Sequence, residues 1–359
     1  MEYDFKDGNG PVPAHKHSNG GGWVADTATV AETAYVGPYA KVSGYAEVSE
    51  DAKVSENAKV YGCAKVYGCA KVYGCAKVSG YAEVSGYAKV SGYAEVSEDA
   101  QVSGYAEVSE NAKVSGYAKV SGYARVYGGA EVSENAKVYG CAKVYRYARV
   151  SGYAKVSGYA RVSENARVYG GAEVSENASV SGYAEVSEDA KVSEDAKVSG
   201  YARVYGGAEV SEDAQVSGYA EVYGCAKVYR YAKVYGCAKV SGYARVYGGA
   251  EVSENARVSG YAEVSEDAQV YGNARVYGNA RVSGGVYLKR GEYSKTPTSI
   301  NRSDGYTFTM QSDMSIVSGC RDFTLEEAES YWGNPEHHLY KESYSILKAL
   351  ITIHKAKEI

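Results

Sequence analysis

The sequence predicts an all-β protein, a parallel β-solenoid with a small α+β module at its C-terminal end. Valine occupies every sixth position from Val24 to Val282, 44 valines in one unbroken register, and alanine lies two residues before nearly every one. Tyrosine occurs 39 times and glycine 42 times, whereas leucine does not occur before Leu288, so most of the chain cannot form a mixed globular core. After Val282 the period ends and the composition changes.

The repeating unit reads Ala-x-Val-[Ser/Tyr]-[Gly/Glu]-x, and the residue after alanine is usually Lys, Glu or Arg. Alternation puts Ala and Val on one face, which predicts a short strand with one buried side. The last two residues must turn the chain. Three such units fit a three-sided solenoid with about 18 residues per coil. At a strand spacing of about 4.8 Å, the repeat would make about 14 to 15 coils over about 70 Å.

The two turn positions follow a pairing rule. Where the first is Glu, as in residues 49–51 (Ser-Glu-Asp), the second is Asp or Asn, and where the second is Tyr or Cys, the first is usually Gly. From Val42 onward nearly every turn therefore contains Gly, Asn or Asp, the residues that tolerate a positive φ. Only residues 145–147 and 229–231, both Tyr-Arg-Tyr, break this rule.

The unit Val-Ser-Gly-Tyr-Ala-Lys resembles the hexapeptide-repeat pattern, which has an aliphatic residue at its first position and a small residue at its fifth. The resemblance spans residues 24–282. It implies a single-stranded left-handed parallel β-helix with three sides. Residues 11–26, which include His15, His17 and three consecutive glycines, and residues 318–324 also resemble the ends of uncharacterised bacterial and prophage hexapeptide-repeat proteins, which carry no established activity.

We expect three parts, namely an N-terminal cap over residues 1–23, the β-helix over 24–285 and the C-terminal module over 286–359. The cap should be irregular and should protect the exposed edge of the first coil, with Trp23 covering the column of Val and Ala side chains.

In the module, residues 306–310 and 314–317 predict two short strands. Thr324 begins a capping box for a first helix that Gly333 can end, and a second helix should run over about 340–357. An apolar stripe like that of the second helix most often packs in a core, and next most often forms an oligomer or partner surface.

Charge and composition exclude several classes of protein. The net charge of −5 comes from finely mixed acidic and basic residues, so we expect neither nucleic acid nor a membrane as partner. No basic segment followed by an apolar run precedes the repeat, and no run of apolar residues is long enough to span a bilayer. The default expectation is a cytoplasmic protein with reduced thiols, and association with a virion stays open.

The acyltransferases of this fold, which the chain resembles in its repeat, typically use a histidine base and a loop extruded from the coils. All five histidines lie outside the repeat, and its unbroken register leaves no room for such a loop; they are His15, His17, His337, His338 and His354. We therefore assign no catalytic residue. If the protein is an enzyme, an acyltransferase is the expected class.

Metal and thiol chemistry has equally little support in the sequence. His15 and His17 lack acidic or cysteine partners at ligand spacing, and Cys320 has no identifiable third group to orient it with His337 or His338. Cys63, Cys69 and Cys75 fall on three successive sides of a coil, so they cannot converge on one ion or pair with one another. No metal or cofactor is expected.

Two surface patterns suggest binding, and both have plainer interpretations. Tyrosines at equivalent positions of successive coils should stack, but the longest runs span three coils; they are Tyr87, Tyr105 and Tyr123, and Tyr183, Tyr201 and Tyr219. One side is mainly basic, but Glu107 and Glu251 interrupt it; its cations are Lys53, Lys71, Lys89, Arg125, Lys143, Arg161, Lys197 and Lys233. Tyrosine covering coil edges and a salt-bridged, solvated face explain these patterns.

Three hypotheses follow from the sequence. The first is a non-enzymatic structural or interaction protein, a rigid solenoid rod whose C-terminal module binds a second copy or another protein. The second is an acyltransferase-like protein of the hexapeptide type. The third is a rod that binds a surface such as ice or a glycan.

Overall fold

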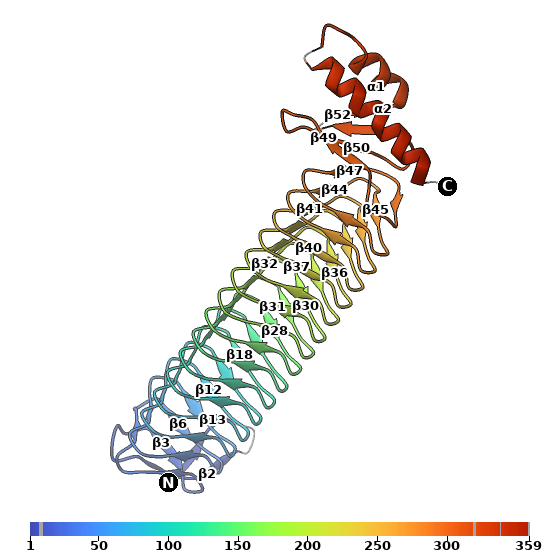
Figure 1. The fold of residues 1–359 in the computed structure, drawn as a ribbon. Coiled ribbons are helices and arrows are strands. Elements are labelled where there is room, and N and C mark those ends of the chain that lie inside the picture. Colours follow the sequence, from blue (N-terminus) through green and yellow to red (C-terminus); the bar gives the residue numbers. More distant parts are fainter. Residues whose placement is uncertain (7–9, 319–320, 338, 358–359) are drawn as a thin grey trace. The chain divides into compact units, whose positions relative to one another are not determined.

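The computed structural model describes residues 1–6, 10–318, 321–337 and 339–357. The chain divides into two compact units, Met1–Asp189 and Ala190–Ile359. Both units consist largely of parallel β-solenoid coils of about 18 residues, about 15 coils in all, and the second unit also contains a small module of strands and helices (Figure 1). The predicted fold class, a parallel β-solenoid with a C-terminal α+β module, is confirmed.

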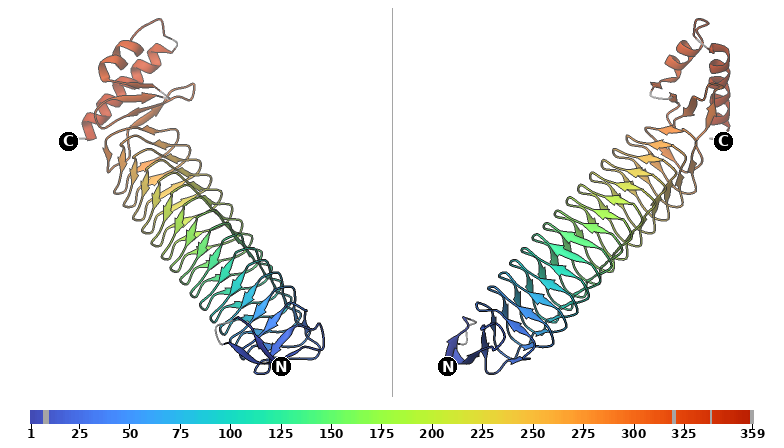
Figure 2. Two further views of the ribbon diagram at one scale, coloured as in Figure 1. Left: turned by 180° about the vertical axis from the view of Figure 1, so that it is seen from behind. Right: turned by 90° about the vertical axis from the view of Figure 1, so that its left-hand side faces the viewer.

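Three parallel sheets form the coils of the first unit, because each strand pairs with the strand three elements later. The sheets begin at β3 (Trp23–Ala25), β4 (Thr29–Val30) and β5 (Tyr35–Val36). Most coil strands contain only two residues, an outward residue and an inward valine, as in β10 (Lys65–Val66). The second unit repeats the pattern from β31 (Lys191–Val192) onward (Figure 2).

Backbone hydrogen bonds between successive coils extend beyond the strands into the bends. In one hexapeptide the N–H groups of Lys65, Tyr67 and Cys69 donate to carbonyl oxygens of the next coil at 2.9, 3.0 and 2.8 Å. The third of these donors is a turn residue, and its acceptor is the Gly86 carbonyl in the bend of that coil. Strands and bends therefore belong to the same continuous ladder, which is why so short a strand suffices.

The interior of the coils contains almost nothing but alanine and valine. Every repeat Ala from Ala34 to Ala280 and every repeat Val from Val36 to Val276 has 0% of its surface exposed. Full burial of one valine contributes about 1.5 to 3 kcal/mol relative to exposure. The narrow interior leaves no space for larger side chains until the last coil, where Leu288 and Tyr293 replace valine.

The turn rule is correct in outline but wrong about which residue takes the left-handed conformation. At the first turn position φ is positive whether the residue is Gly or Glu, for example +74° at Gly62 and +56° at Glu50. In most Glu turns the following Asp or Asn has an ordinary negative φ; the exceptions are Asp213 and Asp267. The bend geometry thus fixes the first position, and Glu accepts a conformation that costs an L-residue about 1 to 2 kcal/mol. Nothing in the structure explains why Asp or Asn follows it.

The two Tyr-Arg-Tyr turns obey the same geometry. Arg146 and Arg230 both have φ of +54°, so arginine takes the place of Gly or Glu. Each arginine is paired with a glutamate at the equivalent turn of a neighbouring coil, Arg146 with Glu164 and Arg230 with Glu212, both at 3.4 Å. The apparent exceptions are therefore turns in which opposite charges stack.

The N-terminal cap is more regular than expected, and Trp23 does not cover the Val and Ala column. β1 (Glu2–Asp4) pairs antiparallel with β2 (Pro11–Lys16), which pairs antiparallel with β3. Trp23 lies in register with the outward residue Lys41, and its ring stacks on Tyr3 with centroids 4.3 Å apart. Because side chains alternate along a strand, Val24 takes the inward position and Trp23 must face outward.

A glycine-rich segment pairs with the backbone of the first coil instead. Gly22 donates its N–H to the Val36 carbonyl at 2.9 Å, and the Val36 N–H donates to the Asn19 carbonyl at 3.0 Å. A Cβ atom on Gly20 would lie 2.4 Å from the Val36 oxygen, and one on Gly22 would lie 2.3 Å from the Gly37 oxygen. Gly20 and Gly22 are thus required by close backbone contact at this edge, and Gly21 is favoured by its φ of +74°.

The C-terminal module contains a four-stranded antiparallel sheet and two helices. The strands are β49 (Ser299–Asn301), β50 (Thr307–Met310), β51 (Ile316–Ser318) and β52 (Arg321–Phe323), and the helices are α1 (Leu325–Trp332) and α2 (Tyr340–Lys357). Both helices, two of these strands and the Thr324 capping box were predicted; β49 and β52 were missed because each contains a single apolar residue. Gly333 ends α1 as predicted, but in a right-handed conformation with φ of −79°.

The apolar stripe of α2 forms the core of this module. Ile346, Leu347 and Leu350 pack in one buried cluster with residues of the sheet and of α1; the other members are Phe308, Met310, Ile316, Ala328 and Trp332. The sequence left two interpretations of this stripe open, a core and an oligomer or partner surface. The core interpretation applies to these three residues. Tyr344 and Ile353 remain 37% and 40% exposed.

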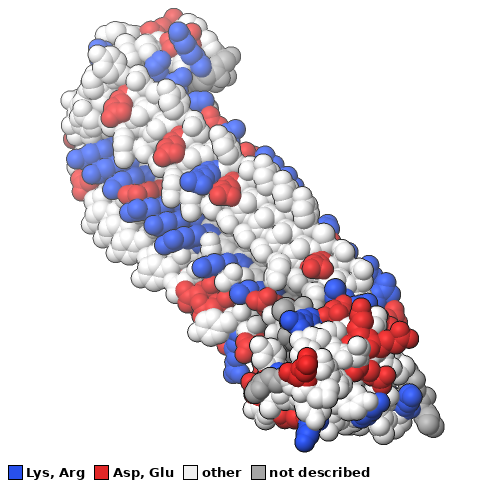
Figure 3. All heavy atoms as spheres, turned by 90° about the horizontal axis from the view of Figure 1, so that it is seen from above, with Lys and Arg blue, Asp and Glu red and all other residues white. Residues whose placement is uncertain are grey.

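Charges of both signs cover the coils (Figure 3). Many outward lysines and arginines pair with a glutamate at the equivalent position of a neighbouring coil, as Lys77 does with Glu95 at 2.9 Å and Lys155 with Glu173 at 2.8 Å. Exposed pairs of this kind contribute about 0 to 1 kcal/mol each. The coils therefore depend mainly on the backbone ladder and the buried Val and Ala side chains.

The turn geometry predicts opposite effects for two substitutions in one column. Gly74→Ala should lower the free energy of unfolding by about 1 to 2 kcal/mol, because φ is +75° and the new Cβ would lie 2.8 Å from the Gly92 nitrogen. Glu56→Gly, one coil earlier, should leave stability unchanged or raise it, because it relieves a φ of +58°. Urea unfolding followed by circular dichroism measures both. Equal stability of Gly74→Ala and wild type would contradict this account of the bend.

Candidate functional site

The best-formed irregular site lies in the second unit, where the coils meet the C-terminal module. The parallel ladder ends with β47 (Tyr287–Leu288) and β48 (Glu292–Tyr293), which pair with β44 (Gln269–Val270) and β45 (Arg275–Val276). An outer strand edge of this kind presents unpaired N–H and C=O groups that can form hydrogen bonds with another chain. The module covers this edge with side chains.

The Gln311 side chain takes the place of a neighbouring strand beside β47. Its side chain, with 0% exposure, accepts a hydrogen bond from the Lys289 N–H at 3.0 Å and donates one to the Tyr287 carbonyl at 2.8 Å. One primary amide thus satisfies two of the backbone groups that another coil would have bonded. This residue follows β50 directly, so the sheet of the module is attached to the last coil through it.

Tyr293 and an ion pair reinforce this attachment. The Tyr293 hydroxyl lies 2.8 Å from the Arg290 carbonyl and 3.0 Å from Gln311 Oε1, and it accepts the Ser312 N–H at 3.2 Å. The guanidinium of Arg290 pairs with Asp322 of β52, which also pairs with Lys289 at 3.1 Å. Burial raises the pKa of Tyr293 far above its ordinary value, so the hydroxyl stays protonated at neutral pH.

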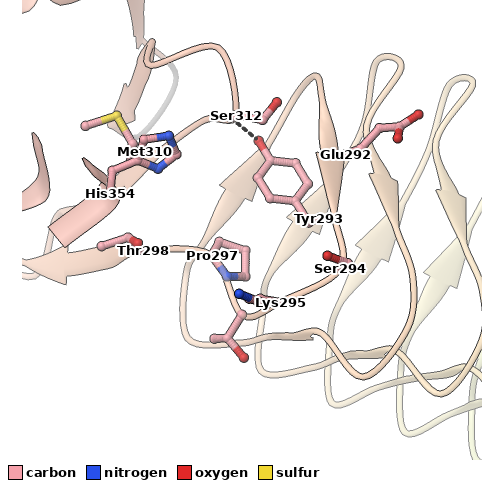
Figure 4. A pocket seen from close by; sticks show the side chains of 10 residues that line it. Glu292, Tyr293, Ser294, Lys295, Pro297, Thr298, Met310, Ser312 and His354 are labelled. Atoms are coloured by element: carbon pink, nitrogen blue, oxygen red, sulfur yellow. Dashed lines mark hydrogen bonds between the residues drawn. The ribbon is translucent and has the colours of Figure 1, made fainter. Parts of the chain in front are cut away.

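A pocket of about 280 Å³ lies beside this network. Figure 4 shows its side chains, with His354 from the last turns of α2 near Met310, and Tyr293 bonded to Ser312. The lining residues are Glu292, Tyr293, Ser294, Lys295, Thr296, Pro297, Thr298, Met310, Ser312 and His354. A small polar molecule would fit this volume.

The pocket contains groups that can carry proton transfer. Histidine is the commonest general base in enzymes, and His354 contributes an imidazole to the lining. Lys295 contributes an ammonium group, and Glu292 is paired with Arg275 at 3.0 Å. The Tyr293 hydroxyl is held in the network just described and serves as a structural donor.

The two N-terminal histidines do not form a joint site. His15 is exposed, and its Nδ1 lies 2.7 Å from Asp26 Oδ1, whereas His17 is buried and its Nδ1 accepts the Asn19 N–H at 3.3 Å. Within the described parts of the chain, no three His, Cys, Asp or Glu side chains are grouped to hold a metal. His15 and His17 therefore interact with different partners in the cap.

Of the thiol and histidine residues considered from the sequence, Cys320 with His337 or His338, the structure describes only His337. Cys320 and His338 lie outside the described residues. His337 packs its ring against Tyr331 at a centroid distance of 4.0 Å. The cysteines of the coils are all free thiols where the structure describes them; they are Cys63, Cys69, Cys75, Cys141, Cys225 and Cys237.

The tyrosines form short stacks, as the sequence predicted. Tyr87, Tyr105 and Tyr123 stack with centroids 5.0 Å apart and planes within 4°, and Tyr201 stacks on Tyr219 in the same way. Further stacked pairs lie at the position after the valine, for example Tyr127 on Tyr145. These stacks are local features of particular coils.

Sequence reasoning missed the residues that matter most at the junction. Gln311 is a single polar residue after a short strand, and no periodicity marks it. Tyr293 could have been suspected, because it is an aromatic residue near the next position of the repeat after Leu288. Tyr293 pairs with Val276, although an unbroken register would pair Val276 with Ser294. The last coil is therefore one residue shorter at this point.

One comparison with known proteins, a family profile, agrees with the β-solenoid fold. The profile of the YdcK β-solenoid repeat matches residues 268–284 and 274–287. A solved structure from Desulfovibrio desulfuricans, provisionally assigned as an acetyltransferase, is similar over 83% of this chain and 75% of its own, with 9% identity and a TM-score of 0.21. Values this low carry no argument about activity. No curated protein matches the sequence. In the described residues, neither helix of the module is long and apolar enough to cross a membrane.

Alkaline pH should weaken the attachment of the module to the last coil. Because the pKa of Tyr293 is raised in the folded protein, its stabilising effect is complete below about pH 10 and is lost as the pH rises further. Fluorescence of Trp332, which packs in the module core, should report this change. Tyr293→Phe should reduce the pH dependence above pH 10 while lowering stability at pH 7. An unchanged alkaline transition in this variant would contradict the assignment.

Proposed function

We propose that this hexapeptide-repeat β-helix is a non-enzymatic structural or interaction protein. Its coils provide a rigid scaffold, and its C-terminal module is the part that binds another protein or a second copy of the chain. The observation that carries this proposal is the Gln311 attachment, which continues the backbone ladder from the last coil into the module. A module fixed in this way can transmit position and force without moving on its own.

The outward face of α2 is the proposed binding surface. Residues spaced three, four and seven apart on this face are exposed, and three of them are lysines; they are Lys341, Tyr344, Lys348 and Lys355. Lys348 pairs with Glu329 at 3.0 Å and lies over the Tyr344 ring. A face with an aromatic residue and several ammonium groups fits an acidic partner surface.

Charge reversal on α2 tests this surface. The double variant Lys341→Glu, Lys355→Glu should dissociate assemblies of the full chain at least tenfold more readily than wild type, because it opposes the acidic partner surface. Lys53→Glu, Lys71→Glu is the matched control, because both of these lysines are exposed on the coils. Light scattering after size-exclusion chromatography in low and high salt gives the mass. A wild-type chain that stays monomeric would exclude a second copy as the partner, and equal dissociation of both variants would contradict the proposed role of α2.

An acyltransferase-like activity is a second candidate, favoured by one observation, the presence of His354 in the junction pocket. If the pocket transfers the acyl group of acyl-coenzyme A to an added alcohol or amine, or to water, the full chain should release free coenzyme A thiol, and His354→Asn should reduce the rate at least a hundredfold. His337→Asn is the control, because His337 packs on Tyr331. No thiol release above the uncatalysed rate would exclude this candidate.

A further inference from the structure

A second pocket, of about 270 Å³, lies in the first unit beside the N-terminal cap. Four of its seven lining residues are lysines; the full lining is Phe5, Lys6, Lys41, Ser43, Lys59, Tyr61 and Lys77. Phe5 and Ser43 are 2% and 3% exposed, so the site has a buried wall.

Three of the lysines repel one another along one column of the coil. Lys41 lies in register with Lys59, and Lys59 with Lys77, on the adjacent strands β6 (Lys41–Val42), β9 (Lys59–Val60) and β12 (Lys77–Val78). Like charges directly opposite on neighbouring strands are destabilising. All three side chains are half-buried, whereas Lys53 and Lys71 on another sheet are exposed. Partial burial weakens screening by water and strengthens the repulsion.

The surroundings neutralise only one of these charges. Lys77 pairs with Glu95 at 2.9 Å, and the Lys41 ammonium lies 5.0 Å from the centre of the Tyr3 ring. Among the residues that the structure describes, no carboxylate lies within ion-pair distance of Lys6, Lys41 or Lys59. The pocket is thus a cationic cavity with at least three ammonium groups to balance.

We propose that this pocket binds a small phosphorylated compound that carries at least two negative charges. Lysine binds phosphate as a point charge, and a phosphate group concentrates up to two negative charges on one compact group, whereas each carboxylate carries only one. Lys6, Lys41 and Lys59 contact the phosphate oxygens, and the Tyr61 and Phe5 side chains border the rest of the ligand. The volume limits that ligand to about the size of pyrophosphate or a sugar phosphate.

Calorimetric titration of the full chain with pyrophosphate tests the proposal. Wild type should bind one pyrophosphate, and Lys59→Gln and Lys6→Gln should each weaken binding at least tenfold. Lys137→Gln is the matched control, because Lys137 also lies between two lysines of its column, Lys119 and Lys155, but on coils further from the cap. Its affinity should equal that of wild type. Citrate at the same ionic strength, the carboxylate probe, should bind at least tenfold more weakly than pyrophosphate.

Thermal unfolding, measured without and with pyrophosphate, gives an independent readout. Lys59→Gln should raise the unfolding midpoint in low salt by removing repulsion, and pyrophosphate should raise the midpoint of wild type but not of this variant. Absence of pyrophosphate binding, equal loss of affinity in Lys137→Gln, or citrate binding as tight as pyrophosphate would each overturn the proposal. If Lys59→Gln is misfolded, Lys6→Gln decides, because Lys6 lies outside the coils. None of these outcomes depends on the proposed role of the C-terminal module.

Discussion

Hydrogen bonding between equivalent hexapeptides of successive coils is the constraint on which both units depend. Most hexapeptides donate from the strand and from the bend to the next coil, so a residue inserted within a strand would break the ladder there and turn the side chains of that strand to the opposite face. The same register places Ala and Val inside at every step. It also fixes a left-handed φ at the first position of the bends from Gly44 to Gly284, which Gly satisfies freely and Glu or Arg satisfies at a cost in energy.

A ladder of this kind leaves open edges, and the chain closes them where the repeat stops. In the first unit, glycines at positions 20 and 22 let the backbone approach Val36 closely enough to bond to it. In the second unit, the Gln311 amide takes the place of a further strand. Such blocked edges prevent pairing with other chains, which is the main aggregation risk of an exposed sheet.

Chemistry gathers at the irregular parts of the chain for a related reason. Along the coils, outward charges face the equivalent positions of the neighbouring coils, and most find an opposite charge or water. At the cap and at the junction, non-repeating segments lie against the coils and create enclosed volumes, one lined by lysines and the other by His354 and Tyr293. The phosphate-site proposal and the acyltransferase candidate therefore concern these two places, the proposed binding surface lies on α2, and the coils serve as scaffold.

The sequence by itself determined the solenoid, its hexapeptide period, its inward Ala and Val, and the helices of the module, because each of these follows from local alternation, capping or spacing. It also predicted that Cys63, Cys69 and Cys75 lie on different sides and that tyrosine stacks are short. Only the tertiary structure decided that Trp23 faces outward, that Glu takes the left-handed turn position, and that Gln311, Tyr293, Lys6 and Lys59 matter. The reason is physical: periodic residues interact with copies of themselves at a fixed separation, whereas the residues of the caps and pockets interact with segments that no period relates to them.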